Sequence, residues 1–223
     1  MMKSLFFCAL LILTATSANI IRNISEVKIG SQVWTTENLE VDKFRNGDPI
    51  PEAKTDREWQ IANKKKQPAY CYFQNDPAKY AKYGILYNWY AVADPRGLAP
   101  NGWHIPSDAE WKQLTDFLGG ADIAGKKMKN PSGWMSEADA TNESGFSAIP
   151  TGYRLSGGHV DNFDGCAGDE CLSGNWWSST EKGKENAWGR SLVYHNDRKG
   201  SSLTLTRPDF YKGHGFSVRC VKD

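Results

Sequence analysis

The sequence predicts an α+β fold, and two observations carry that prediction. Capping-box motifs at residues 55–58 (Thr-Asp-Arg-Glu) and 107–110 (Ser-Asp-Ala-Glu) predict short helices early in the chain. After residue 145 the pattern changes to short alternating segments between turn residues, which is typical of strands. Early helices and late strands, rather than the two in alternation, favour an α+β fold over a wound parallel sheet.

Apolar periodicity places the elements in order. Residues 27–34 predict an opening β-hairpin, and residues 55–67 predict a capped helix that ends before a proline. Residues 84–93 predict a buried helix, although a strand is the alternative because this stretch is apolar on nearly every face. Residues 107–118 predict a second capped helix that ends at a glycine pair. Apolar and polar residues alternate over residues 216–220, which predicts a final half-buried strand.

The start of the chain has the pattern of a signal peptide. Lys3 precedes an apolar run over residues 5–13, and small residues follow at 16–18. We therefore expect residues 1–18 to be removed. Residues 19–223 would form the mature chain, without a transmembrane segment, secreted or at a bacterial cell surface, with the periplasm as the alternative.

The composition excludes several classes of protein. The chain of 223 residues has 27 Lys and Arg against 26 Asp and Glu, and these charges are dispersed. A nucleic-acid binder or a polybasic membrane-surface protein needs a one-sided charge field, so neither is expected. The 9 Trp, 9 Tyr and 9 Phe exclude a disordered chain, because aromatic residues at this density indicate a packed core.

Export would place the cysteines in an oxidising compartment. Four lie after residue 18, namely Cys71, Cys166, Cys171 and Cys220, and four cysteines allow three pairings. The short spacing favours a local Cys166–Cys171 disulfide, which leaves Cys71–Cys220 as the second. Metal binding by these cysteines is the weaker alternative, because no CxxC or nearby histidine supports it.

Several motifs of this chain resemble those of the Fibrobacter succinogenes major paralogous domain, a family of exported bacterial proteins. The matching stretches, in the order of the family, are residues 29–34 with 37–39, 83–92, 102–111, 145–148 with 152–154, 176–180 and 215–221. The resemblance implies one domain over residues 19–223. It also implies a C-type-lectin-like fold, with short helices packed on small, mostly antiparallel sheets and with long loops.

The same resemblance extends distantly to formylglycine-generating enzymes, which share that fold. Those enzymes bind copper through a cysteine pair spaced like Cys166 and Cys171, but the sequence around the pair differs here. Asp164, Asp169 and Glu170 would raise the pKa of a neighbouring thiol, which opposes a reactive thiolate. The resemblance carries no catalytic residue to this chain, so catalysis is not expected.

An acidic loop is the candidate metal site. Asp161, Asp164, Asp169 and Glu170 lie within ten residues, and Ca²⁺ prefers such oxygen ligands. The alternative is a solvated loop held by its disulfide. The sugar-ligating Glu-Pro-Asn and Trp-Asn-Asp motifs of calcium-dependent C-type lectins are absent from the sequence.

Aromatic and amide residues in the later half form the candidate binding surface. A sugar packs its apolar face on an aromatic ring, while amides and carboxylates bond its hydroxyl groups. The candidates are Trp176, Trp177, Trp188, Tyr211, Asn175, Asn196 and Asp197. Burial in the core is the alternative for each tryptophan. Neighbouring strand residues face opposite sides, so at most one of Trp176 and Trp177 is expected to be a binding platform.

Together these observations predict an exported, non-catalytic binding or adhesion module whose ligand is a surface or extracellular glycan. The first alternative is a structural or assembly protein that docks to another exported protein. The second is an enzyme of the formylglycine-generating type. An exposed aromatic platform in a concave site would favour a sugar, whereas a flat apolar patch would favour a protein partner.

Overall fold

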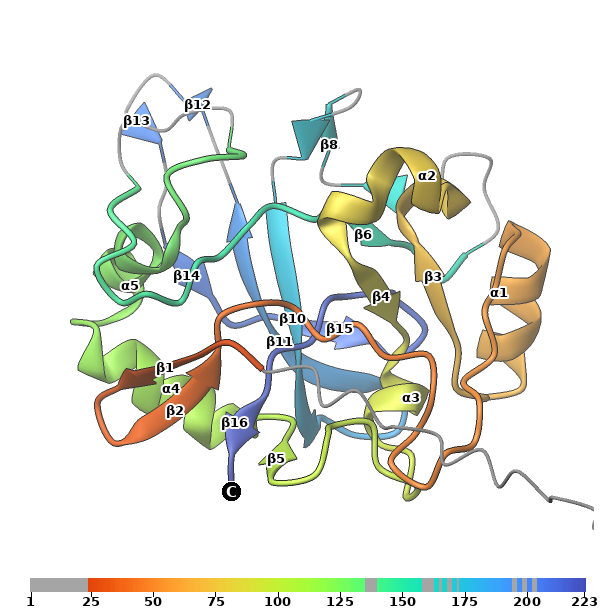
Figure 1. Ribbon diagram of the computed structural model, residues 1–223. Helices are drawn as coiled ribbons and strands as arrows, with labels where there is room; N and C mark the ends of the chain where they lie inside the picture. The colour runs from red at the N-terminus through yellow and green to blue at the C-terminus, as the bar shows by residue number, and fades with distance from the viewer. Residues whose placement is uncertain are drawn as a thin grey trace, which may run out of the picture.

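A four-stranded antiparallel sheet built on β10 (Ser173–Glu181) and β11 (Asn186–Val193) runs through the middle of the molecule (Figure 1). The other neighbours of β11 are β14 (Leu205–Thr206) and β15 (Asp209–Tyr211). The computed structural model describes residues 24–134, 140–157, 163–164, 166–167, 170–171, 173–193, 196–197, 200–201 and 204–223.

A second four-stranded sheet joins the two ends of the described chain. Its order is β1 (Glu26–Ile29), β2 (Gln32–Thr35), β16 (Val221–Lys222) and β5 (Trp103–His104), with all pairs antiparallel. The hairpin predicted over residues 27–34 is therefore confirmed, with Gly30 at a φ of 61° in its turn. Val221 pairs with both Trp34 and His104, which places β16 inside this sheet.

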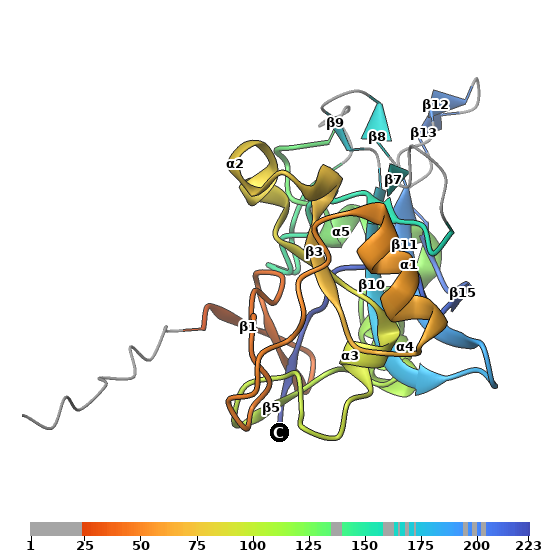
Figure 2. The ribbon, with the colours of Figure 1, turned by 90° about the vertical axis from the view of Figure 1, so that its right-hand side faces the viewer.

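Four two-stranded pairs complete the sheet structure. They are β3 (Tyr70–Tyr72) with β4 (Ile85–Tyr87), β6 (Tyr153–Arg154) with β7 (Phe163–Asp164), β8 (Cys166–Ala167) with β9 (Glu170–Cys171), and β12 (Asn196–Asp197) with β13 (Gly200–Ser201). The β8–β9 and β12–β13 pairs lie at the same end of the molecule (Figure 2).

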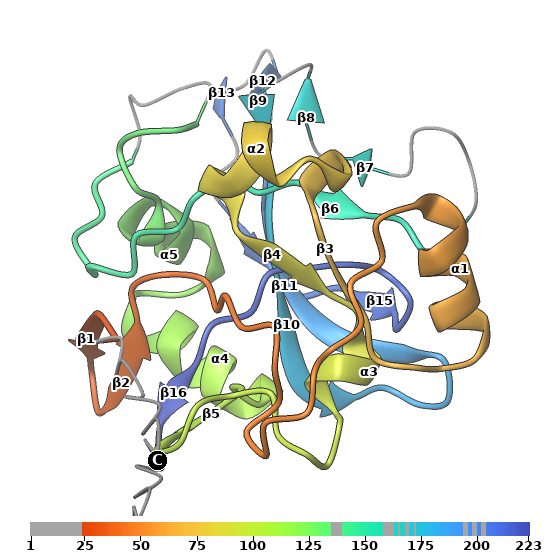
Figure 3. The same ribbon diagram turned by 45° about the vertical axis from the view of Figure 1, so that its right-hand side comes forward.

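The helices are short and lie around the sheets. They are α1 (Asp56–Lys64), η1 (Phe73–Asn75), α2 (Pro77–Tyr80), η2 (Ala81–Tyr83), α3 (Trp89–Val92), α4 (Asp108–Phe117) and α5 (Ala121–Met128). α4 and α5 lie on one side of the β10–β11 pair, and α1 lies on the other (Figure 3). Both predicted capping boxes are present, at Thr55 and at Ser107.

The prediction of one buried helix over residues 84–93 is wrong. Ile85–Tyr87 form β4, and the single turn of α3 follows. Asn88 separates the two elements, because its side-chain oxygen accepts a hydrogen bond from the Ala91 amide at 3.1 Å and so caps α3. The uniformly apolar pattern suits a strand that is buried on both faces, which is what β4 is.

The prediction of a half-buried final strand is also corrected. Residues 216–220 are buried at every position, polar ones included. Phe216 exchanges two backbone hydrogen bonds with Tyr87 of β4, while Ser217 bridges to Trp176 of β10. The segment therefore has a strand along each edge, and both of its faces are buried, with Phe216, Val218 and Cys220 on one and Ser217 and Arg219 on the other.

The core consists of three clusters of apolar residues. One surrounds Trp177 and Phe216, whose ring centroids are 4.5 Å apart. The second surrounds Trp34 and Trp111, at 4.8 Å. The third lies under α1 and contains Trp59. Short helices and several small antiparallel sheets around these clusters confirm the predicted α+β class.

The predicted Cys71–Cys220 disulfide is wrong, because both thiols are free and buried in different core clusters. Cys71 lies opposite Leu86 in the β3–β4 pair, whereas the Cys220 amide donates to Thr35 Oγ1 at 3.1 Å. Burial raises the pKa of the Cys71 thiol to about 11 and that of Cys220 to about 12, so both are protonated at neutral pH.

Cys166 and Cys171 are directly opposed in the register of β8 and β9. Their side chains lie outside what the structure describes, so the disulfide between them stays a prediction. Within the described ranges, every helix is too short or too polar to cross a bilayer.

Candidate ligand-binding pocket

Three of the predicted sugar-binding residues lie in the core instead. Trp176 and Trp177 are 0% exposed, and Asn175 is 2% exposed. Trp176 and Trp177 are neighbours on β10 and face opposite sides of the strand, so their indoles lie in different core clusters. Both indole N–H groups have protein acceptors, Trp176 at Asn38 Oδ1 (2.9 Å) and Trp177 at the Tyr87 carbonyl (2.8 Å). Neither ring is available as a binding platform.

Trp188 and Tyr211 lie on the outer face of β11 and β15. Tyr211 is 39% exposed, and Trp188 is half-buried. The Arg207 guanidinium carbon lies 3.5 Å from the centroid of a Trp188 ring, and Lys182 Nζ lies 4.4 Å from it. Arg207 therefore occupies a ring face that a sugar would need, so Trp188 is a poor platform.

The remaining predicted residues fall mostly outside the described part. Asp161 and Asp169 are not described, and for Asp164 and Glu170 only the backbone is, in β7 and β9. The same holds for Asn196 and Asp197, which form β12. The calcium prediction is therefore untested. Elsewhere, the side chains that the structure describes contain no group of three or more His, Cys, Asp or Glu placed to hold a metal ion.

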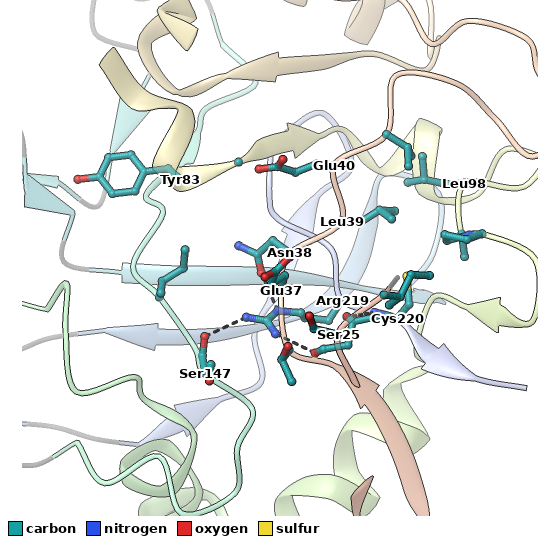
Figure 4. Close-up of a pocket in the computed structure, with 18 of the residues that line it drawn as sticks. Ser25, Glu37, Asn38, Leu39, Glu40, Tyr83, Leu98, Ser147, Arg219 and Cys220 are labelled. Carbon is teal, nitrogen blue, oxygen red and sulfur yellow. Dashed lines mark hydrogen bonds between the residues drawn. The ribbon is translucent and has the colours of Figure 1, made fainter. Parts of the chain in front are cut away.

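A pocket of about 1150 Å³ opens around the segment that follows β2, residues 36–45 (Figure 4). Most of its walls come from that segment, from residues 82–84 and 98–101, and from Ser147, Ile149, Arg219 and Cys220. The volume exceeds that of most single-ligand sites, which span about 300 to 1,000 Å³. It therefore has room for a ligand of several rings.

Segment 36–45 is held in place by its backbone. The Leu39 amide donates to the Val218 carbonyl at 2.8 Å. The Val41 amide donates to Tyr87 Oη, and this hydroxyl donates in turn to the Val41 carbonyl, both at 2.7 Å. These bonds fix the segment against Val218 and against Tyr87 of β4, so the side chains between the anchors are presented to the pocket in a defined way.

Arg219 forms the buried polar wall of the pocket. Its side chain is fully enclosed, and its guanidinium donates to four oxygens: Asn38 Oδ1 (2.7 Å) and the carbonyls of Thr35 (2.8 Å), Phe146 (2.9 Å) and Ser147 (3.1 Å). All four acceptors are uncharged. Burial lowers the pKa of the Arg219 guanidinium to about 9.

Asn38 lies next to Arg219 and is oriented by two donors (Figure 4). Its Oδ1 accepts from Trp176 Nε1 at 2.9 Å and from Arg219 Nε at 2.7 Å. Its Nδ2 is buried and has no acceptor among the described residues. A buried amide donor without a partner carries a desolvation penalty of about 1 to 3 kcal/mol, which a ligand oxygen would remove.

Ser147 adds a strained backbone position to the same wall. Its φ of 56° is left-handed, which is unusual for a serine. Asn142 holds it there, because Asn142 Oδ1 accepts from the Ser147 amide at 2.8 Å and Asn142 Nδ2 donates to Ser147 Oγ at 2.9 Å. Strain of this kind is often found at ligand sites.

The rim of the pocket is charged and the remaining wall is mixed. Glu37, Glu40, Lys43, Arg45 and Lys82 are exposed at the rim. The less polar part of the lining includes Leu39, Phe44, Tyr83, Leu98 and Ile149. Apolar surface with a few convergent polar groups is the usual lining of a small-molecule site.

Sequence reasoning placed the binding surface in the later half and missed this pocket. Arg219 and Asn38 are 181 positions apart, so no local spacing links them. Both lie in motifs that carry the family resemblance, at residues 37–39 and 215–221. That shared motif membership was the available signal.

Comparison with known proteins gives one match. The family model of the Fibrobacter succinogenes major domain matches residues 27–222, which is almost the whole described chain. Neither a curated protein nor a solved structure matches.

Proposed function

Because the chain belongs to the Fibrobacter succinogenes major domain family, and because its fold forms an open pocket whose lining includes motif residues of that family, we propose that it is a non-catalytic binding module for a glycan. The glycan would be one of a cell surface or the extracellular space. A C-type-lectin-like fold stays part of this proposal.

One observation carries the proposal: the amide of Asn38 is held in a fixed orientation at the pocket, with its Nδ2 buried and without an acceptor. Sugar hydroxyls are acceptors for such a donor, and they donate to carboxylates such as Glu37 and Glu40 at the rim. Tyr83 and Phe44 also line the pocket, but these residues are 7% and 3% exposed, so the proposal depends on the polar groups and not on an aromatic platform.

A glycan array with the purified chain tests this proposal. The matched variant is a double change, Glu37→Gln with Glu40→Gln, which keeps the size of two exposed side chains and removes their charge. We expect it to bind the neutral glycans that the parent protein retains more weakly, because an amide oxygen is a weaker acceptor for sugar hydroxyls than a carboxylate. Asp116→Asn, on the far end of α4 and outside the pocket, is the control and should bind normally. A parent protein that retains no saccharide on the array contradicts the proposal.

Calcium is tested in the same experiment. The acidic loop with Asp161, Asp164, Asp169 and Glu170 would act as a metal site only if chelation changes binding. Repeating the array with EDTA distinguishes binding through a metal in the acidic loop from binding in the pocket, because the proposed contacts in the pocket need no metal. Binding that EDTA abolishes would shift the site to the acidic loop.

Export is the second part of the proposal. We expect the protein recovered outside the cytoplasm to begin at Asn19, because small residues precede that position after an apolar run. N-terminal sequencing of the protein from the medium, the periplasm or the cell surface checks this and distinguishes the three destinations. A chain recovered only in the cytoplasm with Met1 intact would contradict it.

An assembly role is the second candidate function. Phe117 and Ile123 are 63% and 48% exposed around the end of α4 and the start of α5, where another exported protein would cover them. Under this alternative, Phe117→Ser would abolish co-purification with that partner and leave glycan retention unchanged. The pocket variant would have the opposite effect.

A further inference from the structure

Among the residues that the structure describes, three arginines are fully buried, and two of them have a carboxylate partner. Arg154 Nη2 lies 2.7 Å from Asp56 Oδ1, and Arg190 Nη1 lies 2.9 Å from Asp108 Oδ1. Arg219 forms no ion pair within the part of the chain that the structure describes, and its acceptors are one amide and three carbonyl oxygens. A buried charge without a counter-charge is costly, so its retention beside an open pocket calls for an explanation.

Other arginines of this protein show which group the Nε–Nη2 edge of a guanidinium binds when a carboxylate is near. In Arg96 and in Arg207, Nε and Nη2 donate to the two oxygens of one carboxylate, that of Asp94 or Asp108. In Arg219, Nε donates to the amide oxygen of Asn38, and Nη2 donates to the Ser147 carbonyl. Nη1 donates to the carbonyls of Thr35 and Phe146. Four of the five N–H groups of Arg219 therefore have an acceptor, and one N–H of Nη2 remains.

The Asn38 amide lies at this same edge. Its Nδ2 is a second buried donor, and the two donors Trp176 and Arg219 fix its orientation through Oδ1. The pocket wall thus offers two N–H donors, one of them on a cation, and both residues line the cavity. A carboxylate matches two such donors, because it offers two oxygens that share a negative charge.

The net charge of the pocket rim is positive, like that of Arg219. Lys43, Arg45 and Lys82 are its cations, and Glu37 and Glu40 are its carboxylates. Glu37 is near enough to stabilise the charge of Arg219 through space, but it is exposed and does not bond to the guanidinium. It therefore leaves the buried donors free.

We propose that the glycan ligand is acidic, and that a sugar carboxylate binds between the Asn38 amide and the Arg219 guanidinium. This proposal rests on the glycan-binding function above and names the class of saccharide that the pocket takes. Uronic acid residues are the simplest sugars with such a carboxylate.

Asn38→Asp is the decisive variant. Asp Oδ1 can still accept from Trp176 and Arg219, so the local packing is kept, while the new carboxylate supplies the missing counter-charge and replaces the free donor with an acceptor. We expect the variant to melt no lower than the parent protein. Its affinity for an acidic sugar should fall by about tenfold or more, because a hydrogen bond to a charged group is lost and a like charge is added.

The probe is trigalacturonic acid, and its fully methyl-esterified form is the neutral match. Isothermal titration calorimetry with the purified chain should detect binding of the acid and much weaker binding of the ester. The difference between the two affinities should become smaller in high salt. Asn101→Asp is the control variant, because it adds the same charge at an exposed position on the rim of the same pocket. It should bind the acid much more tightly than Asn38→Asp does.

The outcomes separate this proposal from the function on which it rests. Equal binding of acid and ester, or an Asn38→Asp variant that binds the acid like the parent protein, would overturn the acidic-ligand assignment and leave glycan binding standing. Equal affinity for a poly-glutamate peptide would overturn the assignment to a saccharide. If the array and the calorimeter both detect no saccharide at all, the proposed function itself fails.

Discussion

At the scale of single residues, a few carboxylates neutralise arginines that the fold buries. Asp108 is the clearest case, because its carboxylate accepts from Arg190 Nη1 at 2.9 Å and from Arg207 at 2.8 and 2.6 Å. Asp108 is the first residue of α4, so the helix N-terminus adds to its stabilisation. The pair that it forms with buried Arg190 joins α4 to β11.

Removing that carboxylate charge should destabilise the fold strongly. Asp108→Asn leaves the Arg190 guanidinium buried without a counter-charge, and we expect a loss of roughly 3 kcal/mol in the free energy of unfolding. Urea denaturation measures it. Asp116→Asn, which removes only an exposed pair with Lys112, should change the same quantity by no more than about 0.5 kcal/mol. Equal effects of the two changes would contradict the importance of the buried pair.

Two histidines should give stability opposite pH dependences. Partial burial lowers the pKa of His104, but hydrogen bonds to the Glu110 (2.6 Å) and Asp223 (2.8 Å) carboxylates raise it more, so its folded pKa lies above 6.5. His104 therefore contributes stability that is complete below about pH 6.5 and disappears as the pH rises through its folded pKa. Burial lowers the pKa of His214 to about 4, so its contribution is present above about pH 6.5 and is lost toward pH 4.

Melting temperatures across this range test both signs. His104→Gln should lower the melting temperature at about pH 5.5 more than at about pH 8.5. His214→Asn should reduce the acid sensitivity between about pH 6.5 and about pH 4. A His104→Gln variant whose deficit grows with pH would show that the histidine does not act through its charge.

At the scale of elements, local signals were sufficient wherever a helix end is fixed by its own side chains. Thr55 with Glu58 and Ser107 with Glu110 were predictable because both partners lie within one turn. Residues 84–93 were not, because apolar side chains on every face are compatible with a buried strand or a buried helix. The free Cys71 and Cys220 were also beyond local reasoning, since the β3–β4 register and the position of β16 keep them in separate clusters.

The capped helix α4 should be structural only. Ser107→Ala removes the acceptor of the Glu110 amide, and we expect a cost of about 1 kcal/mol in the free energy of unfolding. Chemical denaturation measures this cost, and glycan retention should be unchanged because Ser107 lies outside the pocket. Loss of binding without loss of stability would show that the motif contributes to the site.

At the scale of the whole molecule, the pocket depends on contacts that span nearly the full chain. Arg219 contacts Asn38 and Thr35 near one end and Phe146 and Ser147 in the middle. The burial of Arg219 and its uncharged partners exist only in the folded chain, where these distant segments meet, so the sequence alone could not predict them. Composition correctly indicated an abundant aromatic core, but which tryptophans form it depends on the same assembly.

Substitution of a core tryptophan on β10 should destabilise the protein more than substitution of a surface tryptophan on β11. Trp177→Ala should cost about 4 kcal/mol in the free energy of unfolding, because a fully buried indole between Phe210 and Phe216 is removed. Trp188→Ala, at the half-buried surface with Arg207 and Lys182, should cost about 1 kcal/mol. Denaturation of both variants provides the comparison, and similar costs would contradict the assignment of Trp177 to the core.

Segment 215–222, which is buried except for Lys222, is synthesised after all the strands that it contacts. This segment pairs with β2, β5 and β10 and bridges to β4 and β6, and all of these leave the ribosome before it does. Until it arrives, Trp34, Tyr87 and Trp177 lack a neighbour that covers them, so two of the three clusters cannot close. These two clusters thus stay open through nearly all of translation, and an open chain is the form that can pass lengthwise through a narrow membrane channel.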